Sequence, residues 1–134
     1  MSVMNLGIIG GGQLGSMLSV AAKKLNIKTT VYCDDDDAPA QNFSDDFLFG
    51  NYNDKEKILE FINKVDLITY EFENIPFDTL NEINKLKKVL PKPSVNRLIQ
   101  HRLAEKDFVN KLNIRTTRYV SVEKKSDIET LEDF

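Results

Sequence analysis

The sequence has little cysteine and little histidine, and each shortage excludes a class of chemistry. Cys33 is the only cysteine among 134 residues, which excludes an internal disulfide and is typical of proteins from the reducing cytoplasm. His101 is the only histidine, so neither a histidine metal centre nor a Cys–His catalytic pair is supported. We therefore expect a cytoplasmic protein with no metal site of its own.

Long apolar runs and an excess of positive charge are also missing. The longest apolar runs are too short to span a bilayer, and the first residues lack the charged and apolar regions of a signal peptide. The net charge is -3, with basic and acidic residues interleaved, which argues against nucleic-acid and anionic-membrane partners. A hydrophobic share of 41% and a charged share of 29% are typical of a soluble globular protein with room for a core.

The most informative segment follows a short apolar run near the N-terminus. Residues 5–9 are followed at once by glycines at positions 10, 12 and 15, and an amphipathic helix pattern then begins without a gap. This order of strand, glycine turn and helix is typical of βαβ units that bind phosphorylated ligands. We expect Gly10 to allow the turn, Gly12 to let a ligand approach the backbone, and Gly15 to let the helix pack closely. The helix N-terminus would offer free N–H groups to an anion.

Strands and helices alternate along the chain, which predicts an α/β fold with a doubly wound parallel sheet. The predicted strands cover residues 5–9, 28–33, 47–49, 65–70 and 89–90. The predicted helices cover residues 13–25, 54–62, 76–86 and 94–112, the last with an interruption near 101. The apolar residues of the first helix share one helical face: Leu14, Met17, Leu18, Ala21, Ala22 and Leu25. A strand over 116–122 and a helix over 126–134 then predict the start of a second domain.

Three groups of residues follow parallel strands, whose carboxyl ends meet at the edge of the sheet where ligands bind. They are the glycine turn with Gln13 and Leu14, the acidic run from Asp34 to Asp37, and Glu71-Phe72-Glu73-Asn74. Side chains alternate along an extended segment, so Glu71 and Glu73 share one side and Phe72 faces the other. A carboxylate there can accept hydrogen bonds from ribose hydroxyls or an amine. Alternatively, both glutamates only stabilise the helix that follows them through its dipole.

Several other polar or reactive residues have a structural interpretation as well as a functional one. Asp34 lies near the spacing at which an acidic residue binds the adenosine ribose in NAD-dependent enzymes, but a run of four aspartates also makes a solvated loop, which we favour. Arg102 and Lys106 share a helix face, and their spacing alone indicates a solvated face paired with neighbours such as Glu105. Cys33 ends an apolar strand and is expected to be buried and inert.

Three segments together resemble one enzyme family. Residues 10–15 (Gly-Gly-Gly-Gln-Leu-Gly), 69–75 (Thr-Tyr-Glu-Phe-Glu-Asn-Ile) and 100–106 (Gln-His-Arg-Leu-Ala-Glu-Lys) resemble the 5-(carboxyamino)imidazole ribonucleotide synthases. These ATP-grasp enzymes are the ATPase subunit of phosphoribosylaminoimidazole carboxylase in bacterial and fungal purine biosynthesis. The third segment departs from the family pattern at His101, where the family has Asp, while Arg102 and Lys106 match it.

The resemblance implies an ATP-dependent ligase. In this family ATP phosphorylates bicarbonate, the amino group of 5-aminoimidazole ribonucleotide is carboxylated, and ADP and phosphate are released. The resemblance implies that Gly12, Gln13, Leu14 and Glu71 bind the ribonucleotide and that Arg102 binds ATP. It also implies ATP and Mg²⁺ as cofactors and a homodimeric parent protein.

The resemblance further implies two domains. Residues 1–112 would form a Rossmann-like preATP-grasp domain, and residues 113–134 would begin the central ATP-grasp domain. Residues 107–134 hold no candidate for the glycine-rich flap, the adenine-contacting lysine or the Mg²⁺ carboxylates of the family, so we expect this chain not to catalyse alone. Two other functions remain open, namely an NAD-binding Rossmann domain of a dehydrogenase and a non-catalytic ligand-binding module of the same fold.

Overall fold

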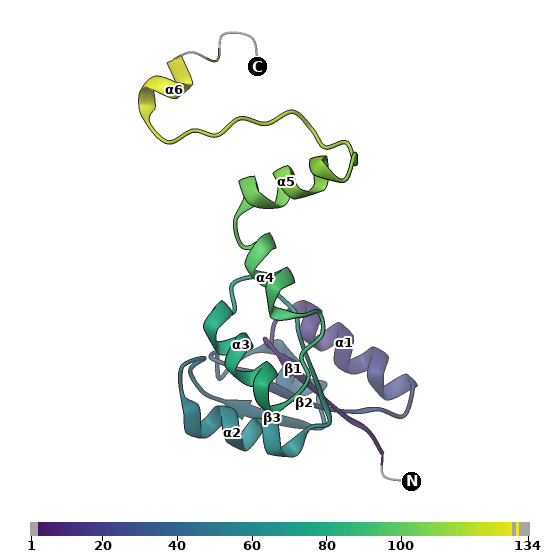
Figure 1. The fold of residues 1–134 in the computed structure, drawn as a ribbon. Coiled ribbons are helices and arrows are strands. Elements are labelled where there is room, and N and C mark those ends of the chain that lie inside the picture. The colour runs from purple at the N-terminus through teal and green to yellow at the C-terminus, as the bar shows by residue number, and fades with distance from the viewer. Residues whose placement is uncertain (1–2, 130, 132–134) are drawn as a thin grey trace. The chain divides into compact units, whose positions relative to one another are not determined.

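The computed structural model of the chain describes residues 3–129 and residue 131 (Figure 1). The chain divides into two compact units, Met1–Gln100 and His101–Phe134. In the part of the chain that the structure describes, no helix is both long enough and apolar enough to cross a membrane.

The first unit is built around a parallel sheet of four strands in the order β3-β2-β1-β4. The strands are β1 (Asn5–Ile9), β2 (Lys28–Cys33), β3 (Asp46–Phe49) and β4 (Leu67–Tyr70). β1 pairs with β2 on one side and with β4 on the other, so Ile9 lies between Tyr32 and Tyr70. Because the strand order changes direction at β1, the segments that follow β1 and β4 meet at the switch point, where such sheets bind ligands.

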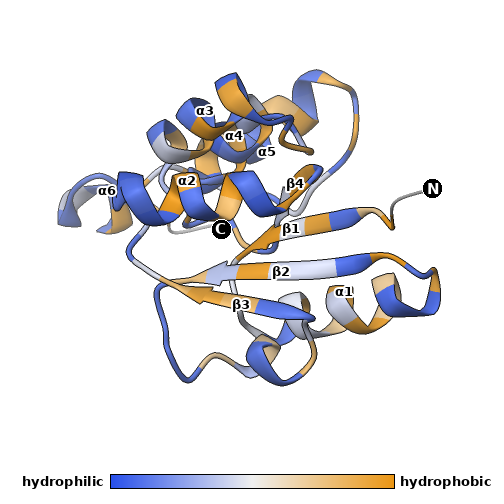
Figure 2. Ribbon diagram, turned by 90° about the horizontal axis from the view of Figure 1, so that it is seen from below, coloured by the Kyte–Doolittle hydropathy of each residue, from blue (hydrophilic) through white to orange (hydrophobic). Residues whose placement is uncertain are grey.

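Helices cover both faces of this sheet, which confirms the predicted doubly wound α/β fold (Figure 2). One face carries α1 (Gln13–Lys24) and the short 3₁₀ helix η1 (Pro39–Asn42). The other face carries α2 (Lys55–Lys64) and α3 (Phe77–Leu86), and α4 (Pro93–Ile99) packs against α3. The apolar cluster on the α2 and α3 side includes Ile9, Tyr32, Phe61, Ile68 and Leu80. The cluster beside η1 includes Ile8, Val31, Ala38, Ala40 and Cys33, which is buried as predicted.

The buried face of α1 is lined by small side chains rather than by its large apolar ones. The buried residues of α1 are Gly15, Ser16, Ser19 and Ala22. Leu14 and Met17, which belong to the predicted apolar face, are 56% and 59% exposed. The Ser19 hydroxyl donates to the carbonyl of Gly15 over 2.9 Å, so this polar group is satisfied inside the fold. Small side chains let α1 pack closely on the sheet. The pattern of large apolar residues therefore did not predict which face of α1 is buried.

The remaining predicted elements are confirmed in part. In place of the strand predicted over residues 89–90, Val89 makes an isolated parallel bridge to Ile68 in β4. The helix predicted over 94–112 is two helices, α4 and α5 (Arg102–Lys111), with the break near 101 as predicted. Residues 116–122 are irregular, so the strand predicted there is wrong. α6 (Lys125–Glu129) lies in the last predicted helix, of which residues 130 and 132–134 lie outside the described residues.

Two buried tyrosines give the free energy of unfolding a dependence on pH. Burial raises the pKa of Tyr32 from 10.0 to about 12, and burial also raises the pKa of Tyr52. Between about pH 10 and 12 the unfolded chain therefore loses protons that the folded chain keeps, so the free energy of unfolding should fall as pH rises. Urea unfolding across this interval should show the fall, and Tyr32→Phe should make it shallower. An equal slope in the variant would contradict the assignment.

Candidate functional site

The glycine turn that joins β1 to α1 has the tight geometry predicted from the sequence. Gly10 has a φ of 105°, in the region that favours glycine. Its N–H donates to the carbonyl of Tyr32 over 2.9 Å, which attaches the turn to the edge of the sheet. The N-cap of α1 is Gly12, which has no side chain to accept from the free N–H groups of the first helical turn. Those groups need a partner from elsewhere in the chain.

That partner is Glu71, the first residue after β4. Its Oε1 accepts a hydrogen bond from the N–H of Gly12, and its Oε2 accepts one from the N–H of Gly15, each over 2.8 Å. The N–H of Glu71 donates to the carbonyl of Ile9 over 3.1 Å, which continues the pairing of β4 with β1. A carboxylate at a helix N-terminus is stabilised by charge-assisted hydrogen bonds and by the helix dipole. Glu71 thus fastens the glycine turn to the end of β4.

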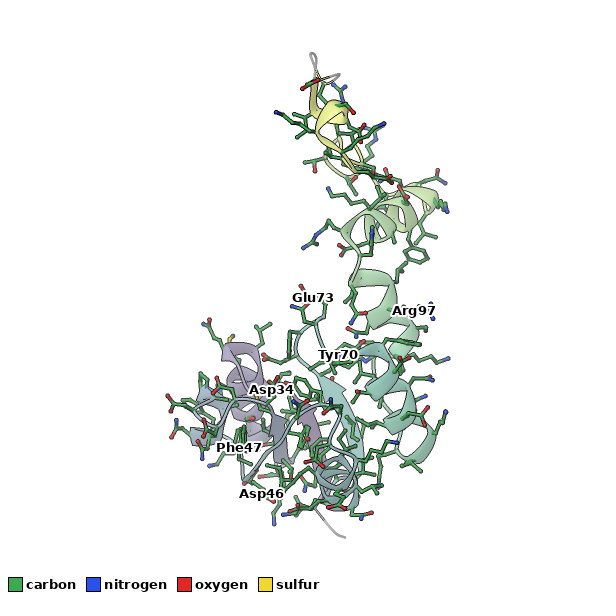
Figure 3. The ribbon with its side chains drawn as sticks, turned by 90° about the vertical axis from the view of Figure 1, so that its left-hand side faces the viewer. Asp34, Asp46, Phe47, Tyr70, Glu73 and Arg97 are labelled. Carbon is green, nitrogen blue, oxygen red and sulfur yellow. The ribbon has the colours of Figure 1, made fainter. Side chains whose placement is uncertain are left out.

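Glu71 does not cap the helix that follows it, so for this residue that alternative is wrong. The N-cap of α3 is Pro76, whereas the Glu71 carboxylate contacts α1. Phe72 packs against the apolar cluster, with its ring centroid 6.3 Å from that of Tyr52, as predicted from the alternation of side chains. Glu73 is exposed and projects away from the sheet (Figure 3). Of the two glutamates, the site therefore depends on Glu71.

The Glu71 contact limits what can bind at the glycine turn. Two of the N–H groups that a phosphate could use at this helix already donate to a carboxylate, and the negative charge beside them repels an anion. A carboxylate can accept about four hydrogen bonds, so each oxygen of Glu71 retains acceptor capacity. The arrangement suits a ligand that brings hydroxyl or amine donors, and it does not suit the pyrophosphate of a dinucleotide.

The other predicted residues of the first unit lie at its surface. Gln13 and Leu14 form the first turn of α1, beside the Glu71 carboxylate contact, and their side chains are exposed. Asp34 follows β2 and is exposed, and the N–H of Asp37 donates to the carboxylate of Asp35 over 3.0 Å. The exposure of the aspartate run is consistent with the solvated acidic loop that we favoured.

Arg102 belongs to the second unit, where it begins α5. Its Nη1 lies 2.7 Å from Oε2 of Glu105, which is the pairing that the helical spacing indicated, and its side chain is 76% exposed. His101 is the N-cap of α5 and accepts from the N–H of Ala104 over 3.4 Å. The assignment of Arg102 to ATP stays a prediction.

Two amide side chains at α4 that had no predicted role also hold the segment after Glu71: Asn96 within the helix and Gln100 at its C-cap. Nδ2 of Asn96 donates to the carbonyl of Ile75 over 2.9 Å, and Asn96 is 0% exposed. Nε2 of Gln100 donates to the carbonyls of Glu73 and Ile75 over 2.7 and 2.8 Å. Both amides fasten the segment after Glu71 to α4. The sequence shows only that Asn96 is an asparagine within a predicted helix. Asparagine is mostly exposed in folded proteins, so its burial here could not be predicted.

A comparison with protein families decides what kind of domain this is. The family model for the ribonucleotide synthetase preATP-grasp domain matches residues 3–100. The chain belongs to this family. The match lies within the first compact unit, Met1–Gln100, and the resemblance drawn from the three sequence segments is confirmed.

The relatives of this preATP-grasp domain are longer proteins. The phosphoribosylaminoimidazole carboxylase of Ogataea methanolica is 38% identical over 137 residues, which cover 99% of this chain and 25% of the relative. The crystal structure of N5-carboxyaminoimidazole synthetase from Staphylococcus aureus complexed with ADP is 31% identical, with a TM-score of 0.85, and the match covers 96% of this chain and 35% of that one.

A third relative was solved with both of its ligands. It is N5-carboxyaminoimidazole synthase from Aspergillus clavatus in complex with ADP and 5-aminoimidazole ribonucleotide. It is 30% identical, with a TM-score of 0.74, and the match covers 87% of this chain and 31% of that one. The chain spans 12% to 34% of the length of the first curated relatives that it matches.

Proposed function

We propose that this chain is the N-terminal, ribonucleotide-binding part of an ATP-dependent ligase. The ligase would carboxylate 5-aminoimidazole ribonucleotide with bicarbonate to 5-(carboxyamino)imidazole ribonucleotide, in purine biosynthesis. The names of the relatives and the ribonucleotide complex of the Aspergillus enzyme support the proposal. The observation that carries it is the Glu71 carboxylate at the glycine turn, which suits the hydroxyl and amine donors of a ribonucleotide.

The proposal gives the residues of this chain a binding role. Glu71 would accept hydrogen bonds from the ribose or amine end of the ribonucleotide, and Gly12, Gln13 and Leu14 would lie against it. Arg102 would bind a phosphate of ATP through its planar guanidinium. ATP would transfer its terminal phosphoryl group to bicarbonate, and the ribonucleotide amine would then take up the carboxyl group as phosphate leaves. No catalytic residue is assigned within this chain.

The rest of the proposal concerns regions and partners beyond the glycine turn. Among the described residues no group of three or more His, Cys, Asp or Glu could hold a metal ion, so the proposal assigns Mg²⁺ no ligand there. Residues 1–112 would form the first domain and residues 113–134 would begin the ATP-grasp central domain. The whole protein would be a cytoplasmic homodimer, and this chain alone would not turn over ATP.

Thermal unfolding of the chain with candidate ligands tests the proposal. A ligand that binds only the folded state raises the midpoint of unfolding. We expect a small, saturable rise with 5-aminoimidazole ribonucleotide and none with NAD or NADP. Glu71→Ala should abolish the rise, while the exposed Glu73→Ala should keep it. A saturable rise with NAD would support a dinucleotide-binding domain instead, and the absence of any rise with the ribonucleotide would contradict the proposal.

The ATP assignment has its own test in the full-length protein. Arg102→Ala should raise KM for ATP about tenfold to a hundredfold, because a charge-assisted hydrogen bond contributes about 1.5–3 kcal/mol. Arg102→Lys should recover little if the contact is bidentate. Arg97 is the matched control, since its guanidinium lies over the ring of Phe77 at 4.9 Å in the first unit. The assignment is wrong if Arg102→Ala and Arg97→Ala leave the same KM for ATP.

A further inference from the structure

The segment that carries Glu71 is irregular, and side-chain amides supply its hydrogen bonds. Residues 71–76 contain no helix or strand. The carbonyls of Glu73 and Ile75 accept from Gln100, and the carbonyl of Ile75 also accepts from Asn96, over 2.7 to 2.9 Å. The amides of Asn96 in α4 and of Gln100 at its C-cap thus donate the hydrogen bonds that backbone N–H groups donate in helices and strands.

These contacts form a continuous path from α4 to the glycine turn. At one end the amides of Asn96 and Gln100 donate to the carbonyl of Ile75. The residue Ile75 is fully buried. At the other end the Glu71 carboxylate holds the N–H groups of α1 at 2.8 Å. The segment between the two ends is short, so few residues separate the amide contacts from the Glu71 carboxylate. Gln100 is followed directly by His101, where the second compact unit begins.

The buried amide of Asn96 makes one side-chain hydrogen bond within the described residues. Its Nδ2 donates to the carbonyl of Ile75 over 2.9 Å, while its Oδ1 is buried without a protein partner. An apolar side chain of similar size could not donate to Ile75. The amide of Asn96 therefore serves to hold the segment that carries Glu71.

We propose that Asn96 and Gln100 are positioning residues for Glu71. Their amides hold the carbonyls of the 71–76 segment, and that segment sets the place of the carboxylate at the glycine turn. The consequence for the ribonucleotide rests on the proposed function, whereas the positioning itself rests on the contacts alone. Neither Asn96 nor Gln100 touches the ligand in this proposal.

Amide hydrogen exchange in the chain separates positioning from a merely structural role. Gln100 is exposed, so Gln100→Met removes the donor with little effect on the core. We expect exchange at the N–H groups of Gly12 and Gly15 to become about fivefold to tenfold faster, while exchange in β1 and β2 stays unchanged. Gln100→Lys should restore slow exchange, because its ammonium group can donate to the same carbonyls.

Matched variants complete the experiment. Asn84→Ala is the control, since Oδ1 of Asn84 accepts from the N–H of Val89 over 3.0 Å and does not contact the Glu71 segment. It should leave exchange at both glycines unchanged. Unchanged exchange in Gln100→Met, or no recovery in Gln100→Lys, overturns the proposal. Faster exchange in Gln100→Met with an unchanged affinity for 5-aminoimidazole ribonucleotide supports the positioning role and overturns the assignment of Glu71 to that ligand.

Discussion

Glu71→Ala should lower the free energy of unfolding of the chain by about 1.5–3 kcal/mol, which is the contribution of hydrogen bonds to a charged group. The variant leaves the N–H groups of Gly12 and Gly15 without their carboxylate at the N-terminus of α1. Urea unfolding of the chain measures this loss. In the full-length protein the same change should raise KM for 5-aminoimidazole ribonucleotide about tenfold to a hundredfold and leave KM for ATP unchanged.

Glu73→Ala is the matched control, because it removes a carboxylate two residues away that is exposed to solvent. It should change neither the unfolding free energy nor the KM for the ribonucleotide. An unfolding free energy lowered equally by both variants would mean that the Glu71 contact adds no stability. A defect that falls on ATP rather than on the ribonucleotide would show that Glu71 serves the other substrate.

Gly12→Val should impair ribonucleotide use at least as severely as Glu71→Ala. A Cβ atom at position 12 would lie 2.8 Å from Oε1 of Glu71, which is too close, so the carboxylate must move. In the full-length protein we expect KM for the ribonucleotide to rise about tenfold to a hundredfold, by loss of a charge-assisted contact, with ATP binding nearly unchanged. A wild-type KM for the ribonucleotide would contradict this account.

A double-mutant cycle tests whether Gly12→Val acts through Glu71. Residues in direct contact give non-additive effects, whereas independent residues give additive ones. We expect Gly12→Val to have a much smaller effect on KM in the Glu71→Ala background, because the displaced carboxylate is already absent. Additive effects would mean that the valine blocks the ligand directly, which was our expectation for Gly12 from the sequence.

The sheet could be predicted from the sequence because its signals are local. The apolar and β-branched runs at residues 5–9 and 28–33 predicted β1 and β2 with their observed bounds. The glycine spacing also predicted the tight turn at Gly10 and placed α1 directly after it. These features depend on neighbouring residues, so a single sequence contains them.

The site could be predicted only in part, because its contacts join distant residues. The segment after β4 was predicted to bind a ligand, but the sequence could not show that the Glu71 carboxylate accepts from the N–H groups at the start of α1. The packing face of α1 was missed because Ser16 and Ser19 satisfy their hydroxyls within the helix and are buried. Asn96 was missed because its burial depends on how α4 meets the 71–76 segment.

The separation of Gly12 and Glu71 has a consequence for the order of folding. The two residues are 59 positions apart, so their contact closes a long loop, and such contacts form later than local ones. During synthesis the glycine turn leaves the ribosome well before Glu71 does, and the amides of Asn96 and Gln100 follow later still. A nascent chain that ends within α2 therefore holds the glycine turn without the carboxylate that fastens it. Under the proposed function, such a chain would not yet bind the ribonucleotide.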